Sequence, residues 1–169
     1  MTREALAELV AKYCHRGLLL DTPLLLAVLL TAFGPRHERA WQRVMGGGLQ
    51  PRDGNWLATF AAGFKVHVTT PHILTEVSNL AGKIDQRLHR DFRVVLAEWV
   101  MVAREENMAA NEIVRHEGFP HLGLADTAIE MLAADRYLVA TTDFALAGRL
   151  RKRGCDVLNF AELLAAEVA

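Results

Sequence analysis

The chain has 169 residues, of which 51% are hydrophobic and 23% are charged, the composition of an ordinary folded domain. These values exclude a disordered tail, a collagen-like repeat and a small disulfide scaffold. The 19 basic and 20 acidic residues give a net charge of −1. A nucleic-acid partner would therefore have to bind at a local site and not through an overall basic field.

Residues 18–33 are the one stretch that resembles a membrane element, but they fall short of the roughly 20 apolar residues of a span and include Asp21. The stretch follows a charged amphipathic segment, which is unlike a signal peptide. The two cysteines, Cys14 and Cys155, fit neither a CxxC motif nor a zinc-ligand spacing. We expect a soluble, cytoplasmic protein with both thiols reduced.

Helical spacing of apolar residues predicts helices within residues 1–16, 24–33, 71–80, 88–102, 125–132, 146–153 and 161–168. Short runs rich in Val, Leu and Thr predict four strands, Gly17–Leu20, Lys65–Thr69, Tyr137–Thr141 and Asp156–Phe160. Glycine and proline mark Gly46–Gly54 as a loop, without the GK[ST] ending of a phosphate-binding loop.

Strands that are apolar throughout and separated by helices require a parallel sheet covered on both faces. The sequence therefore predicts an α/β protein with a three-layer α/β/α architecture and a mainly parallel central sheet. Residues 1–169 form one domain in this interpretation, in which residues 1–16 add an N-terminal helix.

Two aspartates follow predicted strands. Asp21 comes directly after the leucines of the first strand, and Asp143 lies two residues beyond Thr141. In open parallel sheets, ligands bind outside the carboxyl ends of the strands. Each aspartate also suits the N-cap of the helix that follows, where such a side chain contributes about 1 kcal/mol. Taken singly, each is more simply explained as a cap than as a catalytic group.

Glu76 is expected to point inward. Thr70 and Pro71 favour a helix start, and Glu76 shares a helix face with Ile73 and Leu80. A carboxylate buried there costs several kcal/mol unless it is paired. It would pair with an arginine or lysine, lie at the edge of the face after a slight rotation, or share a cation with other acids.

Asp126 begins the predicted helix of Gly123–Glu130, where it could also be a plain N-cap. Together, Asp21, Glu76, Asp126 and Asp143 can converge on one cleft at the carboxyl edge of the sheet. Carboxylates packed together repel one another and raise one another's pKa values. A divalent cation relieves this repulsion, and a site made of oxygen ligands suits Mg²⁺ or Mn²⁺ better than zinc. The 7 histidines show no ligand spacing.

Four segments, in this order, resemble the acidic motifs of PIN-domain ribonucleases, and the VapC-like toxins are closest in pattern. They are Leu18–Thr22, the helix of Glu76, Gly123–Ala128 and Leu138–Phe144. The resemblance covers about residues 17–160. It implies a PIN-like, Rossmann-like fold and an Mg²⁺- or Mn²⁺-dependent endoribonuclease that is commonly a homodimer. For a toxin, it also implies an antitoxin protein as partner.

By matching position, the resemblance implies a set of catalytic, metal-binding acids, namely Asp21, Glu76, Asp126 and Asp143, and makes Thr142 a supporting hydroxyl. The chain departs from the family in three places. Pro23 stands where Asn usually follows Asp-Thr, about 55 residues separate Asp21 from Glu76, and the N-terminal helix is additional.

Cationic side chains must flank an acidic cleft that binds RNA. One candidate group follows Asp143 along its helix, and the other lies in the predicted long helix: Arg149, Arg151, Lys152 and Arg153, and Arg87, Arg90 and Arg93. Such residues can contact phosphates, or they can simply form solvated surface that complements a helix dipole. The tryptophans, Trp41, Trp56 and Trp99, are expected in the core or at an interface and not as base-stacking platforms.

Two other functions fit the same residues. A PIN-like module without metal could act by binding, with residues 24–33 and 161–168 as its apolar surface. A different phosphohydrolase could also use four carboxylates, because a fold does not fix a function.

Overall fold

The computed structural model describes residues 2–32, 38–46, 48–134 and 136–167. These residues form a five-stranded sheet in the order β3-β2-β1-β4-β5, in which every pairing is parallel. The strands are β1 (Leu18–Leu20), β2 (His67–Thr69), β3 (Arg104–Glu105), β4 (Leu138–Thr141) and β5 (Val157–Asn159).

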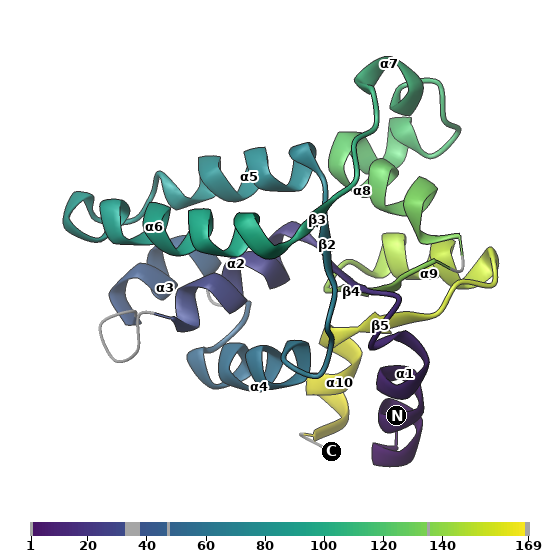
Figure 1. Cartoon of the computed structure of the whole chain (residues 1–169), viewed down its shortest axis with the longest axis horizontal. Coiled ribbons are helices and arrows are strands. Elements are labelled where there is room, and N and C mark those ends of the chain that lie inside the picture. Colours follow the sequence, from purple (N-terminus) through teal and green to yellow (C-terminus); the bar gives the residue numbers. More distant parts are fainter. Residues whose placement is uncertain (1, 33–37, 47, 135, 168–169) are drawn as a thin grey trace.

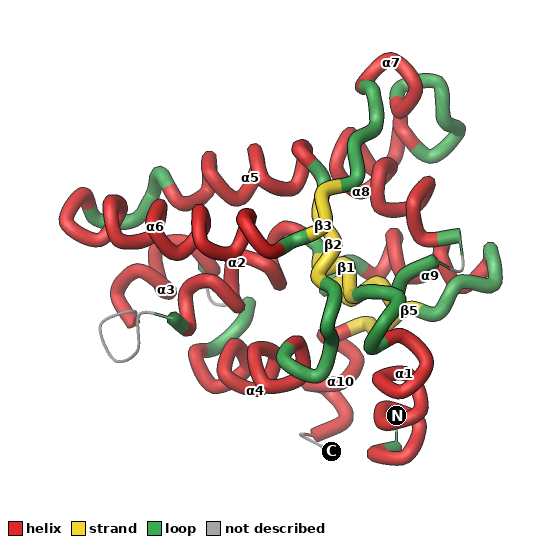
Figure 2. The backbone as a smooth tube through the Cα atoms, viewed as in Figure 1, coloured by secondary structure: helices red, strands yellow, loops and turns green. Residues whose placement is uncertain are grey.

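Helices fill most of the remaining chain (Figures 1 and 2). They are α1 (Arg3–Tyr13), α2 (Thr22–Thr31), α3 (Glu38–Met45), α4 (Pro51–Ala61), α5 (Pro71–Ala81), α6 (Gln86–Val102), α7 (Ala110–Ile113), α8 (Phe119–Ala133), α9 (Phe144–Lys152) and α10 (Phe160–Glu167). None of these described helices is both long and apolar enough to cross a membrane.

The central strand explains the layers. Leu18 and Leu19 are fully buried and Leu20 is 2% exposed, so both faces of β1 must be covered. Figure 1 shows α2, α5 and α6 on one side of the sheet and α8 and α9 on the other. The predicted three-layer α/β/α architecture is thereby confirmed.

The strand order creates a switch point between β1 and β4. The chain leaves β1 toward β2 and β3, and later returns to place β4 on the other side of β1. Loops after β1 and β4 therefore diverge at the carboxyl edge of the sheet, the usual position of a ligand site in such folds. Asp21 and Asp143 stand in these two loops.

The four predicted strands are confirmed in place, although each is shorter than expected. β3 was missed because its two residues are charged and exposed and leave no apolar signal. The predicted loop Gly46–Gly54 is wrong in its second half. Pro51 begins α4, and Gln50 and Asp53 form a capping box at its start, which outweighs the turn tendency of Pro and Gly.

Several helix ends also differ from expectation. Phe160, expected in a strand, begins α10. Phe33 and Val168, the expected last residues of two helices, lie outside the described residues. The long central helix is confirmed as α6, but Phe92 is its one buried residue. Both cysteines are free, as expected, with Cys155 buried and Cys14 partly exposed.

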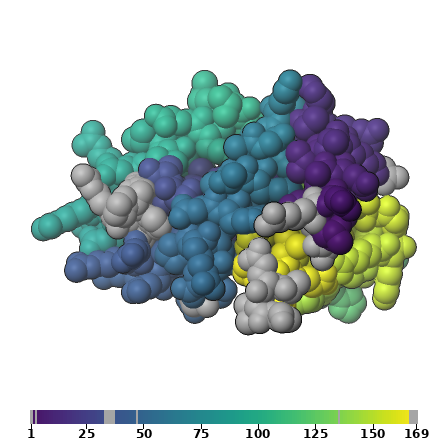
Figure 3. Space-filling view, turned by 90° about the horizontal axis from the view of Figure 1, so that it is seen from below, coloured from purple at the N-terminus to yellow at the C-terminus, as the bar shows by residue number. Residues whose placement is uncertain are grey.

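The amino ends of the first strands lie at the other end of the molecule from the switch point. There α1, α4 and the C-terminal segment form one continuous surface, seen from below in Figure 3. Trp56 of α4 packs against Phe60, with ring centroids 5.4 Å apart, and against Phe160, at 5.3 Å. Aromatic packing therefore joins α4 to the start of α10.

Gly17 is a position where glycine is required. Its φ is +138°, and a Cβ would lie 2.7 Å from Cγ2 of Val68 and 3.1 Å from Cδ1 of Tyr137. We expect Gly17→Ala to lower the free energy of unfolding by about 1–3 kcal/mol. Denaturant titration measures this value.

The matched control is Gly148→Ala. Gly148 lies within α9, and a Cβ there meets no atom within 4 Å. This change should raise the free energy of unfolding by about 0.5–1 kcal/mol, because alanine loses less backbone entropy. A Gly17→Ala protein as stable as the wild type would contradict the packing at the start of β1.

Candidate active site

Asp21 is the N-cap of α2, and its side chain also accepts hydrogen bonds from the end of β4. Its Oδ1 accepts the N–H of Leu24 at 2.9 Å, the expected capping bond. Its Oδ2 accepts the Thr141 hydroxyl at 2.6 Å and the Thr142 N–H at 2.9 Å, both from the end of β4. The side chain is 2% exposed. Because β1 pairs with β4, these groups hold Asp21 at the switch point.

Asp143 is the N-cap of α9, and its Oδ1 accepts the N–H of Leu146 at 2.9 Å. Its own N–H donates to Thr141 Oγ1 at 2.9 Å. The Thr141 hydroxyl thus donates to Asp21 and accepts from Asp143, so that one side chain joins the starts of α2 and α9. Asp143 itself is exposed.

The supporting hydroxyl therefore belongs to Thr141, whereas the sequence resemblance assigned that role to Thr142. Thr142 contributes its backbone N–H. Thr141 is the last residue of β4, and Thr142 lies just beyond it. Both are threonines, so the sequence alone could not distinguish them. Thr141 is fully buried and directed at the carboxylate, which decides the role.

Glu76 is exposed, which makes its expected inward orientation wrong. The buried face of α5 runs through Ile73, Val77 and Ala81, and Glu76 lies at the edge of that face. Its Oε2 accepts the Thr22 hydroxyl at 2.7 Å, and Thr22 directly follows Asp21. Glu76 is therefore tied to the start of α2 while keeping one carboxylate oxygen free of hydrogen bonds among the described residues.

Asp126 is partly buried and is not an N-cap, contrary to expectation. α8 begins at Phe119 and is interrupted at Gly123, whose φ of +75° is a left-handed conformation that favours glycine. Asp126 stands three residues past this kink. Asp126 thus lies in the second part of the helix, close enough to the other acids for their charges to affect its pKa.

Burial is the main cause that raises the pKa of Asp126 to about 7. The negative charges of Asp21, Asp143 and Glu76 raise it further, in that order. All four predicted acids therefore lie close enough to interact. They come from the starts of α2 and α9, the second part of α8 and the middle of α5.

Burial also raises the pKa of Asp21, to about 6. The hydrogen bonds from Thr141, Leu24 and Thr142 favour the charged form and lower the pKa, while the charge of Asp143 raises it. Burial outweighs these hydrogen bonds. Asp21 and Asp126 are thus carboxyl groups that titrate near neutral pH.

Within the described ranges, no lysine, arginine or histidine forms an ion pair with any of these four acids. An ion pair of Glu76 with an arginine or lysine, one of the three alternatives for this residue, is thus not found among the described residues. Oxygen donors alone suit Mg²⁺ or Mn²⁺. Among the described residues, no group of three or more His, Cys, Asp or Glu is placed so that it could hold a metal ion. Glu76 and Asp143 are exposed, so their side chains have room to rotate inward.

The expected RNA-binding cations differ in their surroundings. Three of the four on α9 and its C-cap are engaged by acids: Arg149 and Arg153 contact Glu130 and Glu117, and Arg151 pairs with Glu162. A second set is exposed and forms no ion pair among the described residues, namely Lys152, Arg87, Arg90 and Arg93. Sequence reasoning missed the acidic partners because they lie on other elements.

Two exposed apolar side chains adjoin the acids and were not expected from the sequence. Phe144 follows Asp143 and is 63% exposed, and Leu124 lies two residues before Asp126 and is 38% exposed. Of the three tryptophans, Trp41 is buried as expected, and Trp56 and Trp99 are half-buried.

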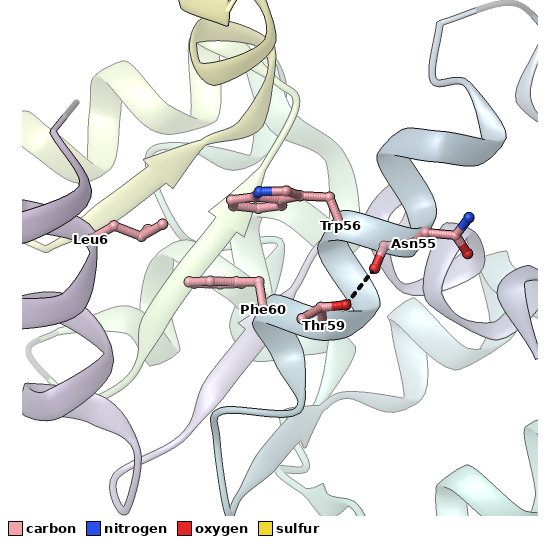
Figure 4. A pocket seen from close by; sticks show the side chains of 5 residues that line it. All are labelled: Leu6, Asn55, Trp56, Thr59 and Phe60. Carbon is pink, nitrogen blue, oxygen red and sulfur yellow. Dashed lines mark hydrogen bonds between the residues drawn. The ribbon is translucent and has the colours of Figure 1, made fainter.

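A shallow pocket of about 420 Å³ lies elsewhere, between α1 and α4 (Figure 4). Its lining is Leu6, Asn55, Trp56, Thr59 and Phe60. The two aromatic rings are stacked, and Leu6 points toward them from α1. The lining contains no titratable side chain, and its helices lead into the amino ends of β1 and β2. This pocket therefore has no part in the carboxylate chemistry.

Comparisons of this chain with protein-family models, with curated proteins and with solved structures found no match.

Asp126→Asn tests the electrostatics of the site. A carboxyl whose folded pKa is raised stabilises the fold fully below its unfolded pKa of 3.8, and that stability is lost as the pH rises toward about 7. Without divalent cations, the wild type should lose stability over this range. Asp126→Asn should flatten the loss and be about 1–2 kcal/mol more stable at pH 8, after allowance for partial exposure.

Denaturant titration across pH checks this expectation. Asp91→Asn on α6 is the matched control, because Asp91 is exposed and unpaired among the described residues. Parallel pH profiles for the wild type and Asp126→Asn would mean that the acids do not interact.

Thr141→Val and Thr142→Val separate the two adjacent hydroxyls. Thr141→Val removes a hydrogen bond that lowers the pKa of Asp21, so the pKa should rise and the free energy of unfolding should fall by about 1–3 kcal/mol at neutral pH. Thr142→Val keeps the backbone N–H and should change both values little. NMR titration and thermal unfolding measure the two effects, and equal effects of both variants would refute the role of Thr141.

Proposed function

We propose that the protein is a metal-dependent endoribonuclease that hydrolyses RNA phosphodiester bonds at the carboxylate site. The observation that carries the proposal is the proximity of four acids around the switch point. Hydrogen bonds from the end of β4 hold Asp21 there, Glu76 accepts a hydrogen bond from the neighbouring Thr22, and the charges of Asp21, Asp143 and Glu76 add to burial in raising the pKa of Asp126. Four acids act on one another there without a cationic partner among the described residues. Placing acids together is costly unless a cation is shared, and Mg²⁺ or Mn²⁺ is the cation that oxygen donors favour.

Each acid has a role suited to its surroundings. Asp21 is held by three hydrogen bonds and forms the fixed member of the set. Asp126 titrates near pH 7 and suits acceptance of a proton from the attacking water. Glu76 and Asp143 are exposed and can complete the ligand set by rotating. A bound Mg²⁺ or Mn²⁺ would lower the pKa of a coordinated water and offset charge on the phosphoryl oxygens.

The surrounding backbone favours an anionic substrate. α2, α5 and α9 all begin at the carboxyl edge of the sheet, at Thr22, Pro71 and Phe144, and helix N-termini carry positive partial charge. Pro23 replaces the polar residue usual in the resembled family, and it lies in the first turn of α2, where a missing N–H costs nothing. This departure is therefore compatible with the site.

The resemblance to VapC-like toxins extends the proposal in three ways. It adds a homodimer as the working form, an antitoxin protein as partner and the cytoplasm as location. The exposed arginines of α6, Arg87 and Arg90, are candidate contacts for the RNA backbone, because arginine pairs with phosphate in a bidentate manner. Binding of RNA through them should weaken as salt rises.

Asp21→Asn is the decisive variant. Asparagine caps a helix as well as aspartate does, so the fold should persist, while cleavage of single-stranded RNA with Mg²⁺ or Mn²⁺ should fall by about 10²-fold or more. Asp91→Asn should cleave like the wild type. Assays on RNA, DNA and a phosphomonoester, run side by side, identify the substrate class.

Thermal unfolding with and without Mn²⁺ completes the test, since an ion that binds only the folded state raises Tm. The wild type should show the rise and Asp21→Asn should show less. Equal cleavage by Asp21→Asn and the wild type would disprove the site. No cleavage together with no Tm shift would favour the non-catalytic binding module.

A further inference from the structure

We propose that Arg149 and Arg153 form a phosphate-binding subsite next to the carboxylate site, and that the exposed carboxylate of Glu117 covers this subsite until RNA displaces it. This inference rests on the proposed ribonuclease function. It assigns the two arginines to one particular phosphate of the RNA, and it makes Glu117 an internal competitor of that phosphate.

A buried carboxylate orients the two arginines. The Glu130 side chain is 0% exposed and accepts hydrogen bonds from Arg149 Nε at 3.0 Å on both oxygens. Arg153 Nε lies 3.1 Å from the same carboxylate. Both guanidinium groups therefore turn their Nε atoms toward Glu130. Their terminal nitrogens remain for another partner, in the forked arrangement that suits carboxylate or phosphate.

Glu117 is that other partner in this structure. Its Oε1 lies 3.0 Å from Arg153 Nη2 and 3.8 Å from Arg149 Nη2. The Glu117 side chain is 76% exposed, while those of Arg149 and Arg153 are 29% and 39% exposed. Exposed ion pairs contribute little to stability. Glu117 can therefore be displaced at small cost, whereas Glu130 cannot.

The single negative charge of Glu130 offsets only part of the positive charge of Arg149 and Arg153. Two arginines carry two positive charges, and buried Glu130 offsets one of them. Glu117 offsets the other, and a phosphate of RNA could do so instead. His116 adds an interaction, because its Nε2 lies 3.2 Å from Arg153 Nη2. The two arginines and two glutamates are thus neutral together, and they carry one net positive charge when Glu117 is displaced.

The backbone before α8 holds Glu117 over the arginines. A Cβ on Gly118 would overlap Oε2 of Glu130 and lie 3.1 Å from Arg149 Nη2, so the chain passes directly against the cluster. The Gly118 N–H donates to His116 Nδ1 at 3.1 Å and closes this turn. The position of Glu117 follows from the path of its neighbours, and its side chain is free to leave without unpacking them.

The helix geometry places this cluster beside the acids. Glu130 is four residues beyond Asp126 on α8, which puts it on the same helix face about 6 Å away. Arg149 belongs to α9, the helix that Asp143 caps. A phosphate held by the arginines would therefore neighbour the phosphate at the carboxylates in the same RNA strand.

Glu117→Gln tests the proposal as a gain of binding. The probe is a short single-stranded RNA, whose Kd is measured in EDTA so that no cleavage occurs. Removal of the competitor should tighten binding by about two- to five-fold, the range expected for an exposed ion pair. The dependence of Kd on salt should also steepen, by up to about one counterion.

The matched control is Glu112→Gln on α7. Glu112 is exposed and forms no ion pair among the described residues, so the variant changes net charge equally without releasing an arginine. Its Kd should stay close to that of the wild type. In an Arg153→Gln background, the gain from Glu117→Gln should shrink, which a double-mutant cycle measures.

The outcomes separate this proposal from the proposed function. If the wild type cleaves RNA while Glu117→Gln and Glu112→Gln bind it equally, or Glu117→Gln binds it more weakly, the subsite is refuted and the nuclease stands. If the wild type neither binds nor cleaves RNA, the proposed function fails, and the subsite proposal fails with it. A selective gain in Glu117→Gln, lost in the Arg153→Gln background, supports the subsite.

Discussion

Repulsion between carboxylates is the constraint on which this end of the molecule depends. Four acids, Asp21, Glu76, Asp126 and Asp143, stand on four different helices around the switch point of the sheet. Burial raises the pKa of Asp126, and the negative charges of the other three acids raise it further. Capping by Asp21 and Asp143 stabilises two helix starts, while the mutual repulsion of the four acids opposes that gain. The proposed cation would relieve this repulsion.

Hydrogen bonds decide which of the acids are fixed. The Thr141 hydroxyl joins Asp21 to the start of α9, and the Thr22 hydroxyl joins Glu76 to the start of α2. The two threonine hydroxyls thus connect three helix segments, through the carboxylates of Asp21 and Glu76 and the backbone N–H of Asp143. The site is therefore a hydrogen-bonded network between elements on both sides of the sheet. Removal of either threonine hydroxyl would break a connection between two of these elements.

The sequence predicted the parts of the fold that depend on apolar burial. The leucines of β1 and the Asp21 that follows them indicated both a central strand and a ligand position. β3 could not be predicted, because Arg104 and Glu105 are exposed and pair with β2 through backbone atoms alone. α4 was missed in part because the capping box of Gln50 and Asp53 is a local signal stronger than the Gly and Pro content around it.

The sequence pointed to four acids that influence one another's charge, but it did not predict how they are oriented. Helical spacing put Glu76 on a face with Ile73, yet the spacing cannot distinguish the centre of a face from its edge. The partners of Arg149 and Arg153 were hidden for a different reason. Glu130 and Glu117 lie on other elements, so only the packing of α8 against α9 brings them together.

Helix α6 has a dynamic consequence of its own. It is 17 residues long and has a single fully buried residue, Phe92, while Leu88, Val95, Leu96 and Trp99 pack against the core only partly buried. Segments with few buried contacts open locally well before the whole protein unfolds. The outer rim of the molecule that carries Arg87 and Arg90 should therefore open locally, and exchange its amide hydrogens, before the sheet does.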